Sequence, residues 1–200
     1  MQYQITEDRP LSWSAISSFE WSAEQWYDNY ILGIKTTSPE LEFGSMVDKR
    51  LQVDPEYLPN VPRYPHMQHK MRSKWHDIPI IGVPDGLDFE TTPKVLSDYK
   101  TGKNPWTQKK ADQTGQLTMY TMLLYLTDGI KPEEWDCKIL WLPTAYTPDF
   151  KIDFRNPTDP ELITFNTKRT MLDMLKFGQR IKDTYALMQR YVEQRQRQTV

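Results

Sequence analysis

The chain has 200 residues, with 25 basic against 27 acidic side chains and a formal net charge of −2. This length is enough for one domain with its own hydrophobic core, and we expect residues 1–200 to form a single domain. The charge excludes a general attraction to nucleic acid, so any such binding must come from a local basic patch. Cys137 is the single cysteine, which excludes a disulfide within the chain and a cluster held by thiolates.

The N-terminus carries neither the basic start nor the apolar run of a signal peptide, and no apolar run approaches the length of a membrane span. We therefore expect a cytoplasmic protein with no membrane association. The first predicted element is an aromatic-rich helix that Ser12 or Ser14 caps and Gly33 ends, because apolar side chains recur at three- and four-residue steps between them. A second, shorter helix is predicted over residues 43–52.

Residues 56–77 are expected to form an irregular connection because of their prolines. The segment also carries a run of histidines and basic side chains between His66 and His76. Two interpretations stay open: the run holds phosphates, or it is ordinary solvated surface.

The stretch from Ile80 to Lys103 contains two short apolar runs, residues 80–83 and 95–96, separated by a polar turn sequence at 90–93. This pattern predicts a hairpin. Residues at i and i+2 of a strand share a face, so Asp98 and Lys100 emerge side by side. Asp85, at the end of the first strand, is expected next to them across the pair. Two carboxylates and an ammonium group beside a buried hairpin favour a divalent cation, with the lysine orienting water or helping to deprotonate it.

The second half of the chain is predicted to begin with a polar loop over residues 104–112 and a helix over 114–126. Strands are predicted over 135–142 and 150–154, with a turn at 143–149 between them. In the second strand, apolar and polar residues alternate. Apolar residues from Leu172 to Val192 keep a helical spacing, and we expect this long helix to pack over the sheet.

The order Pro84-Asp85 followed by Asp98-Tyr99-Lys100 resembles the signature of the PD-(D/E)XK nuclease superfamily. The form DYKTGK, with Gly82 ahead of the Pro-Asp pair, is most similar to the RecB-like exonuclease branch. The resemblance implies an α/β fold with a restriction-endonuclease-like core, in which helices flank a mixed central β-sheet. Some RecB-like nucleases carry four cysteines around an iron–sulfur cluster, and a chain with one cysteine is expected to have no such cluster.

The resemblance also implies roles for particular side chains. Gly44 and Asp48 match a family motif, G-x-x-x-H, in which the histidine contacts the metal, so Asp48 is either a metal ligand or a solvated helix residue. Gln116 and Tyr120 share a helix face and match the Q-x-x-x-Y element that lines the active site. The implied ligands of Mg²⁺ or Mn²⁺ are Asp48, Asp85, Asp98 and the carbonyl of Tyr99. The implied catalytic residues are Asp85, Asp98, Lys100, Gln116 and Tyr120.

The implied function is metal-dependent hydrolysis of DNA phosphodiester bonds, with attack on single-stranded or free ends favoured over internal cleavage. Substrate binding is expected to use Lys103, Lys109 and Lys110, with Trp106 available for base stacking. The alternative is a catalytically inactive, nuclease-like subunit that binds DNA or a protein partner. The sequence points to no particular protein partner.

Overall fold

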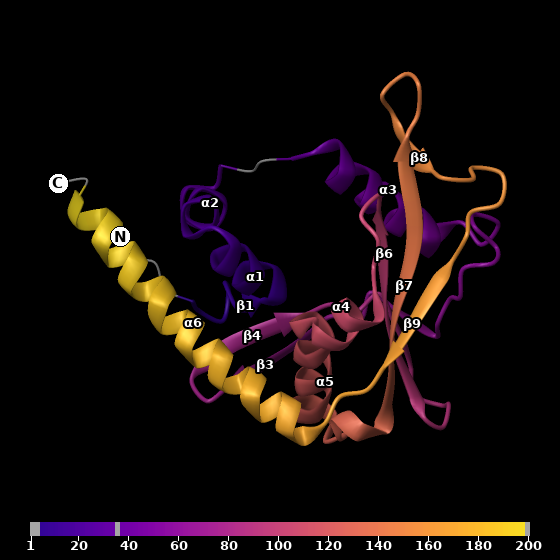
Figure 1. The fold of residues 1–200 in the computed structure, drawn as a ribbon. Coiled ribbons are helices and arrows are strands. Elements are labelled where there is room, and N and C mark those ends of the chain that lie inside the picture. The colour runs from indigo at the N-terminus through magenta and orange to yellow at the C-terminus, as the bar shows by residue number, and fades with distance from the viewer. Residues whose placement is uncertain (1–4, 35–36, 199–200) are drawn as a thin grey trace.

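The computed structural model describes residues 5–34 and 37–198, whose arrangement is shown in Figure 1. A six-stranded sheet runs in the order β2, β5, β6, β7 and β8, with β9 also paired to β7. Its strands are β2 (His66–Met67), β5 (Gly86–Asp88), β6 (Lys94–Gly102), β7 (Trp135–Tyr146), β8 (Ile152–Phe154) and β9 (Ile163–Thr167). The sheet is mixed, because β6 and β7 are parallel and the other neighbouring strands are antiparallel.

A smaller sheet has three strands in the order β1 (Leu11–Ser12), β4 (Ile78–Gly82) and β3 (Met71–Trp75). The predicted pairing of the first apolar run with residues 95–96 is therefore wrong, since that run is the central strand of this other sheet. β5 forms the hairpin with β6 instead. Pro84, which has no backbone N–H to donate, lies between β4 and β5, where the chain leaves one sheet for the other.

The helices begin at the caps that their sequences provide. Ser12 accepts a hydrogen bond from the backbone N–H of Ala15 at 3.2 Å, and Gly33 ends the first helical region with a left-handed φ of 73°, as predicted. The helices are α1 (Trp13–Trp21), α2 (Ala23–Tyr27) with a following π-helical turn (Asp28–Leu32), α3 (Pro39–Val53), α4 (Gln108–Gln113), α5 (Gly115–Asp128), a 3₁₀ turn (Pro132–Glu134) and α6 (Met171–Gln198).

Helices cover both faces of the large sheet, which confirms the predicted α/β class with a mixed sheet flanked by helices. On one face, Leu96 of β6 and Ile139 of β7 are buried in the larger core, which they share with α1, α5 and α6. On the other face, Tyr99 and Leu140 are buried with Val47 of α3 in a smaller core. Side chains alternate along a strand, so Asp98 shares the α5 face of β6 with Leu96. Its neighbours in sequence, Ser97 and Tyr99, point to the opposite face.

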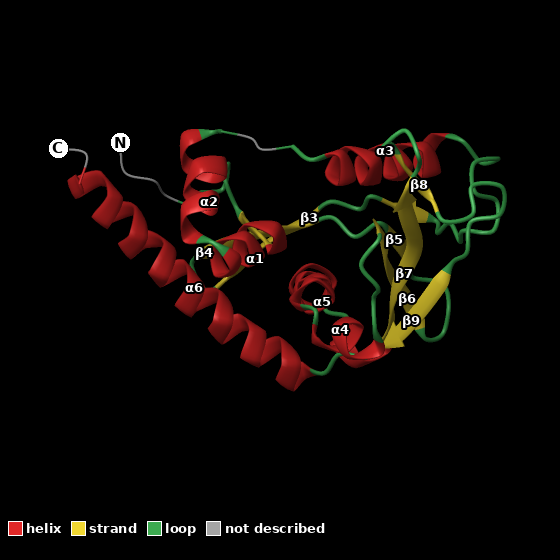
Figure 2. Ribbon diagram, turned by 45° about the horizontal axis from the view of Figure 1, so that its top comes forward, coloured by secondary structure: helices red, strands yellow, loops and turns green. Residues whose placement is uncertain are grey.

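The C-terminal helix does not pack over the large sheet, contrary to the expectation. Figures 1 and 2 show α5 between α6 and the strands of that sheet. The buried side chains of α6, which include Phe177 and Ile181, pack with those of α1, α2 and α5. Leu172 and Leu175 of the predicted apolar stripe are more than half exposed, because α6 turns another face to the core.

Four elements lie where the sequence predicted irregular chain or nothing. β2 and β3 fall within 56–77, α4 begins inside the predicted loop 104–112 and ends at Gln113, and β9 is a short edge strand that the sequence analysis did not predict. None of the helices in the described part of the chain has the length and apolar character needed to span a bilayer.

Candidate active site

Four segments of the chain meet at a cleft of about 520 Å³ beside the C-terminal half of β6, an interior strand of the large sheet. They are α3, the connection between β4 and β5, strand β6, and the first turns of α5. All seven residues predicted as catalytic or as metal ligands line this cleft: Asp48, Asp85, Asp98, Tyr99, Lys100, Gln116 and Tyr120. The structure thus brings them together from positions up to 72 residues apart in the sequence.

Asp98 is the most buried carboxylate of the cleft, with 1% of its surface exposed. The Lys100 ammonium lies 2.5 Å from its Oδ2, as the shared strand face predicts. The Gln116 amide donates to its Oδ1 at 2.7 Å, and the same nitrogen lies 2.8 Å from the Tyr120 hydroxyl. The four-residue spacing on α5 therefore places both polar groups of that helix against Asp98.

Asp85 lies across from Asp98 and receives two hydrogen bonds. The backbone N–H of Tyr99 donates to its Oδ2 at 2.6 Å, which ties Asp85 to β6. The side-chain amide of Gln68 donates to its Oδ1 at 2.7 Å and also to Oδ1 of Asp48 at 2.9 Å. Asp48 therefore belongs to the same hydrogen-bonded group as Asp85.

Gln68 is a residue of the site that the sequence analysis missed. β2 pairs with β5 so that Met67 lies opposite Gly86, and one step further Gln68 meets Asp85. Its backbone N–H donates to the Asp85 carbonyl at 3.2 Å, and its φ of 52° lies in the left-handed region. Glu40 of α3 also lines the cleft without having been predicted. A spacing rule finds neither residue, because both reach the site through tertiary contacts.

The cleft concentrates negative charge. Burial, with a smaller contribution from the Asp98 carboxylate, raises the pKa of Asp85 to about 8. Burial also raises the pKa of Asp48, and the hydrogen bonds from Gln52 and Gln68 offset this only in part. Burial by itself lowers the pKa of Lys100, but the neighbouring carboxylates, Asp98 first among them, outweigh it and the net shift is upward. The ammonium is therefore charged at neutral pH.

The donor set of the cleft suits Mg²⁺ or Mn²⁺. Its oxygens are the hard ligands that these ions take, and the buried Oδ2 of Asp98 accepts no hydrogen bond, its contact being the ion pair with Lys100. In residues 5–34 and 37–198, no three His, Cys, Asp or Glu side chains converge closely enough to hold a metal by themselves. A cation here would thus take further ligands from backbone carbonyls and water, as Mg²⁺ commonly does.

The four predicted substrate-binding residues do not line this cleft. The Lys103 ammonium lies 4.6 Å from the centre of the Tyr146 ring, near Glu40. Trp106, Lys109 and Lys110 line a neighbouring cavity beside the start of α5.

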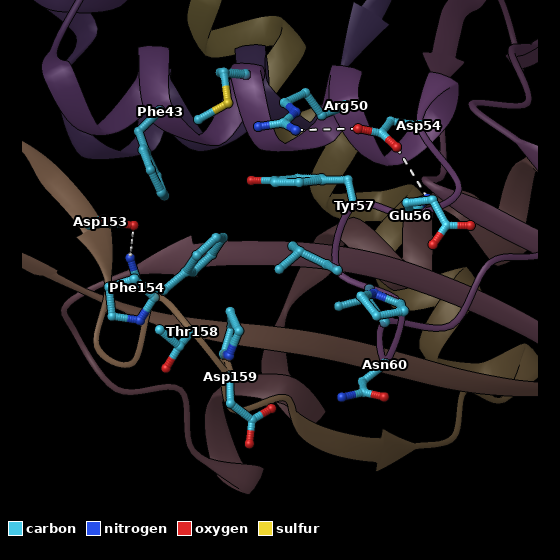
Figure 3. Close-up of a pocket in the computed structure, with 16 residues that line it drawn as sticks. Phe43, Arg50, Asp54, Glu56, Tyr57, Asn60, Asp153, Phe154, Thr158 and Asp159 are labelled. Atoms are coloured by element: carbon cyan, nitrogen blue, oxygen red, sulfur yellow. Dashed lines mark hydrogen bonds and ion pairs between the residues drawn. The ribbon is translucent and has the colours of Figure 1, made fainter.

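A larger cavity of about 610 Å³ lies on the other side of α3 (Figure 3). Figure 3 shows Arg50 above the ring of Tyr57, 3.9 Å from its centre, with Phe154 across the space below. Its carboxylates come from Asp54, Glu56, Asp153 and Asp159, and Arg50 is paired with the first of these. This cavity contains none of the predicted site residues, and its charge disfavours a phosphate.

No family model and no curated protein matches the chain. Among solved structures, a protein from Eubacterium rectale described as a "putative exonuclease" is similar over 96% of this chain and 86% of its own, with 13% identity and a TM-score of 0.58. The protein SSO0001 is similar over 92% of this chain and 78% of its own, with 11% identity and a TM-score of 0.52. At these identities the likeness concerns the fold, and the chain has the mixed α/β fold that these two proteins share.

Proposed function

We propose that the protein is a divalent-metal-dependent deoxyribonuclease whose reaction takes place in the cleft of Asp85, Asp98 and Lys100. The observation that carries this proposal is the buried Asp98–Lys100 ion pair facing a second carboxylate that is held by hydrogen bonds from two directions. Such an arrangement costs folding free energy unless a cation and a phosphate bind there. The fold likeness to the protein described as a "putative exonuclease" supports the same class of reaction.

Asp85, Asp98 and the carbonyl of Tyr99 would hold Mg²⁺ or Mn²⁺, with Asp48 as a further candidate ligand. When bound, the cation would supply Lewis-acid stabilisation of the charge that grows on the phosphate and would lower the pKa of water. In the hydrolysis, a water molecule loses a proton to solvent and its oxygen forms a bond to phosphorus. The bond from phosphorus to the leaving sugar oxygen breaks, and that oxygen takes up a proton from solvent.

Lys100 would act as a donor in this reaction. Because its pKa is raised, its ammonium keeps its protons at neutral pH, and it orients water and offsets charge on the phosphate rather than serving as the base. Gln116 and Tyr120 would fix the direction of the Asp98 carboxylate. Burial raises the pKa of Tyr120, so its hydroxyl stays neutral in this role.

We further propose that the enzyme attacks single strands from free ends. The formal net charge of −2 gives no support for wrapping a duplex, whose binding requires many phosphate contacts. The lysines and the tryptophan predicted for substrate binding lie next to the cleft rather than in it, which suits a strand that extends beyond the reacting phosphate.

The experiment is cleavage of end-labelled linear single-stranded DNA and of a covalently closed circle of the same sequence, each with Mg²⁺, with Mn²⁺ and with EDTA. We expect loss of the linear DNA with either metal, survival of the circle, and no cleavage in EDTA. Lys100→Ala should lower the rate by about 10²–10³-fold while the variant keeps its circular-dichroism spectrum. Equal cutting of both DNAs would show an endonuclease, and no cutting would leave a non-catalytic binding subunit.

A further inference from the structure

A cavity of about 380 Å³ opens beside the start of α5. Its lining residues are Trp13, Trp106, Thr107, Lys109, Lys110, Gln113 and Thr114. The first turn of α5 separates this cavity from the carboxylate cleft, because Thr114 lines the one and Gln116, two residues further on, lines the other.

Trp13 reaches this position because of a glycine. The indole packs directly on the first turn of α5, where a Cβ atom on Gly115 would lie 2.4 Å from Cζ3 of Trp13. Phe177 of α6 packs at the same glycine and also contacts the indole, with ring centroids 6.0 Å apart. The ring is therefore held firmly, yet it is only partly buried and contributes to the cavity wall.

The charge of the cavity is opposite to that of the cleft. No carboxylate lines it, and its two lysines are both exposed. The Lys110 ammonium lies 4.2 Å from the centre of the Trp106 ring, so one indole already carries a cation on its face. The Arg180 guanidinium, which pairs with Glu20, lies 5.2 Å from the centre of the Trp13 ring.

This combination of two indole rings, two ammonium groups and no carboxylate suits the binding of an unpaired nucleotide. Each base can stack on an aromatic face, and the phosphate beside it can pair with a lysine. A duplex offers its phosphates but keeps its bases stacked internally, so it would use the lysines and not the indoles. The large acidic cavity on the other side of α3 has the opposite charge and would repel the same strand.

We propose that this cavity, which we call the tryptophan subsite, binds an unpaired base and its phosphate in a single strand whose neighbouring phosphate lies in the carboxylate cleft. The inference rests on the proposed function, since it names the form of nucleic acid which that cleft receives. Trp13 supplies the stacking surface, and Lys109 and Lys110 hold the phosphate.

The test is a binding titration of fluorescein-labelled (dT)12 by fluorescence anisotropy in EDTA, so that no cleavage takes place. Trp13→Leu keeps an apolar side chain on Gly115 and removes the stacking surface, and it should weaken binding about tenfold. Trp21→Leu is the matched control, because Trp21 lies on the same helix, is 86% exposed and does not line the cavity. Trp13→Phe should restore most of the affinity.

Lys110→Gln provides a second test. Because Lys110 is exposed, this substitution leaves the packing of the hydrophobic core unchanged. It should reduce the slope of log affinity against log salt by about 0.7 for single-stranded DNA, the value for one lost phosphate contact. A blunt 12-base-pair duplex should bind more weakly than (dT)12 and should not respond to Trp13→Leu.

The two proposals fail separately. If Trp13→Leu and Trp21→Leu bind (dT)12 equally, or if Lys110→Gln leaves the salt slope unchanged, the tryptophan subsite is wrong even when the protein cleaves DNA. If (dT)12 binding depends on Trp13 but no metal supports cleavage, the subsite stands and the proposed nuclease reaction is wrong. The circular-dichroism spectrum of each variant distinguishes loss of binding from loss of folding. If Trp13→Leu does not fold, the results for Lys110→Gln and Trp13→Phe test the subsite instead.

Discussion

The side-chain amide of Gln68 donates a hydrogen bond to the Asp85 carboxylate at 2.7 Å and places its nitrogen between that carboxylate and Asp48. A donor at this point does what a cation would do, because it brings positive charge to two oxygens that otherwise repel each other. Gln68 would therefore compete for these oxygens with any metal ion that Asp48 and Asp85 would hold.

Gln68→Ala should lower the stability of the metal-free protein at pH 8 by about 1–3 kcal/mol, because two partly buried carboxylates lose their shared donor. It should also increase the rise in melting temperature on adding Mn²⁺, since the cation no longer displaces an amide. The matched control is Gln52→Ala, which removes a donor to Asp48 at 3.2 Å on the exposed side of α3. Thermal melts with and without Mn²⁺ measure both effects, and identical behaviour of the two variants would contradict the role given to Gln68.

Asp48→Asn tests whether Asp48 is a metal ligand. The amide can still accept the hydrogen bond of Gln68, but it brings no charge, so the rise in melting temperature with Mg²⁺ should shrink. Asp48→His should move the preference toward Mn²⁺, which takes an imidazole nitrogen more readily than Mg²⁺ does. The control is Glu42→Gln, which removes an exposed acid from the same helix and should leave the metal response unchanged. An unchanged response of Asp48→Asn would make Asp48 an ordinary helix residue.

The stability of the metal-free protein should fall as the pH rises from about 4 to about 8. The pKa of Asp85 is about 8 in the folded protein against an ordinary value of 3.8, so the folded state binds more protons than the unfolded chain across this interval. The free energy of unfolding then decreases with pH, and it levels off above pH 8. Melting temperatures between pH 4 and 9 in EDTA measure this. Asp85→Asn should flatten the profile, and a profile of wild-type shape in that variant would assign the effect to other groups.

Gly178→Ala should destabilise the protein, although alanine is usually the better helix former by about 1 kcal/mol. A Cβ atom at this position of α6 would lie 2.3 Å from the Trp75 ring of β3, and a rigid indole cannot yield without moving the small sheet. We expect a loss of about 1–3 kcal/mol, as for other overpacked contacts, in chemical denaturation. Lys182→Ala, on the exposed side of α6, should change the stability by less than about 0.5 kcal/mol. A stabilised Gly178→Ala would mean that Trp75 does not pack tightly on α6.

Several features of the site followed from the sequence because they depend on near neighbours. The two-residue period of a strand places Lys100 beside Asp98, and the four-residue turn of a helix places Gln116 beside Tyr120. The Ser12 cap and the Gly33 stop are equally local, since a cap bonds to the backbone three residues away and a left-handed φ belongs to one residue. These relationships hold wherever the elements lie.

The tertiary structure alone decided which distant segments meet. The apolar run before Asp85 had two possible strand partners, and its place in the smaller sheet depends on packing against β1 and β3 rather than on its own residues. Gln68 reaches Asp85 through the register of a two-residue strand, and a shift of one residue would turn its side chain to the other face. Trp13 packs on the first turn of α5 because Gly115, about a hundred residues later, has no Cβ atom. The local period of a helix or strand determines on which face of that element a side chain lies. Which other element packs against that face is determined by the free energy of packing the whole chain.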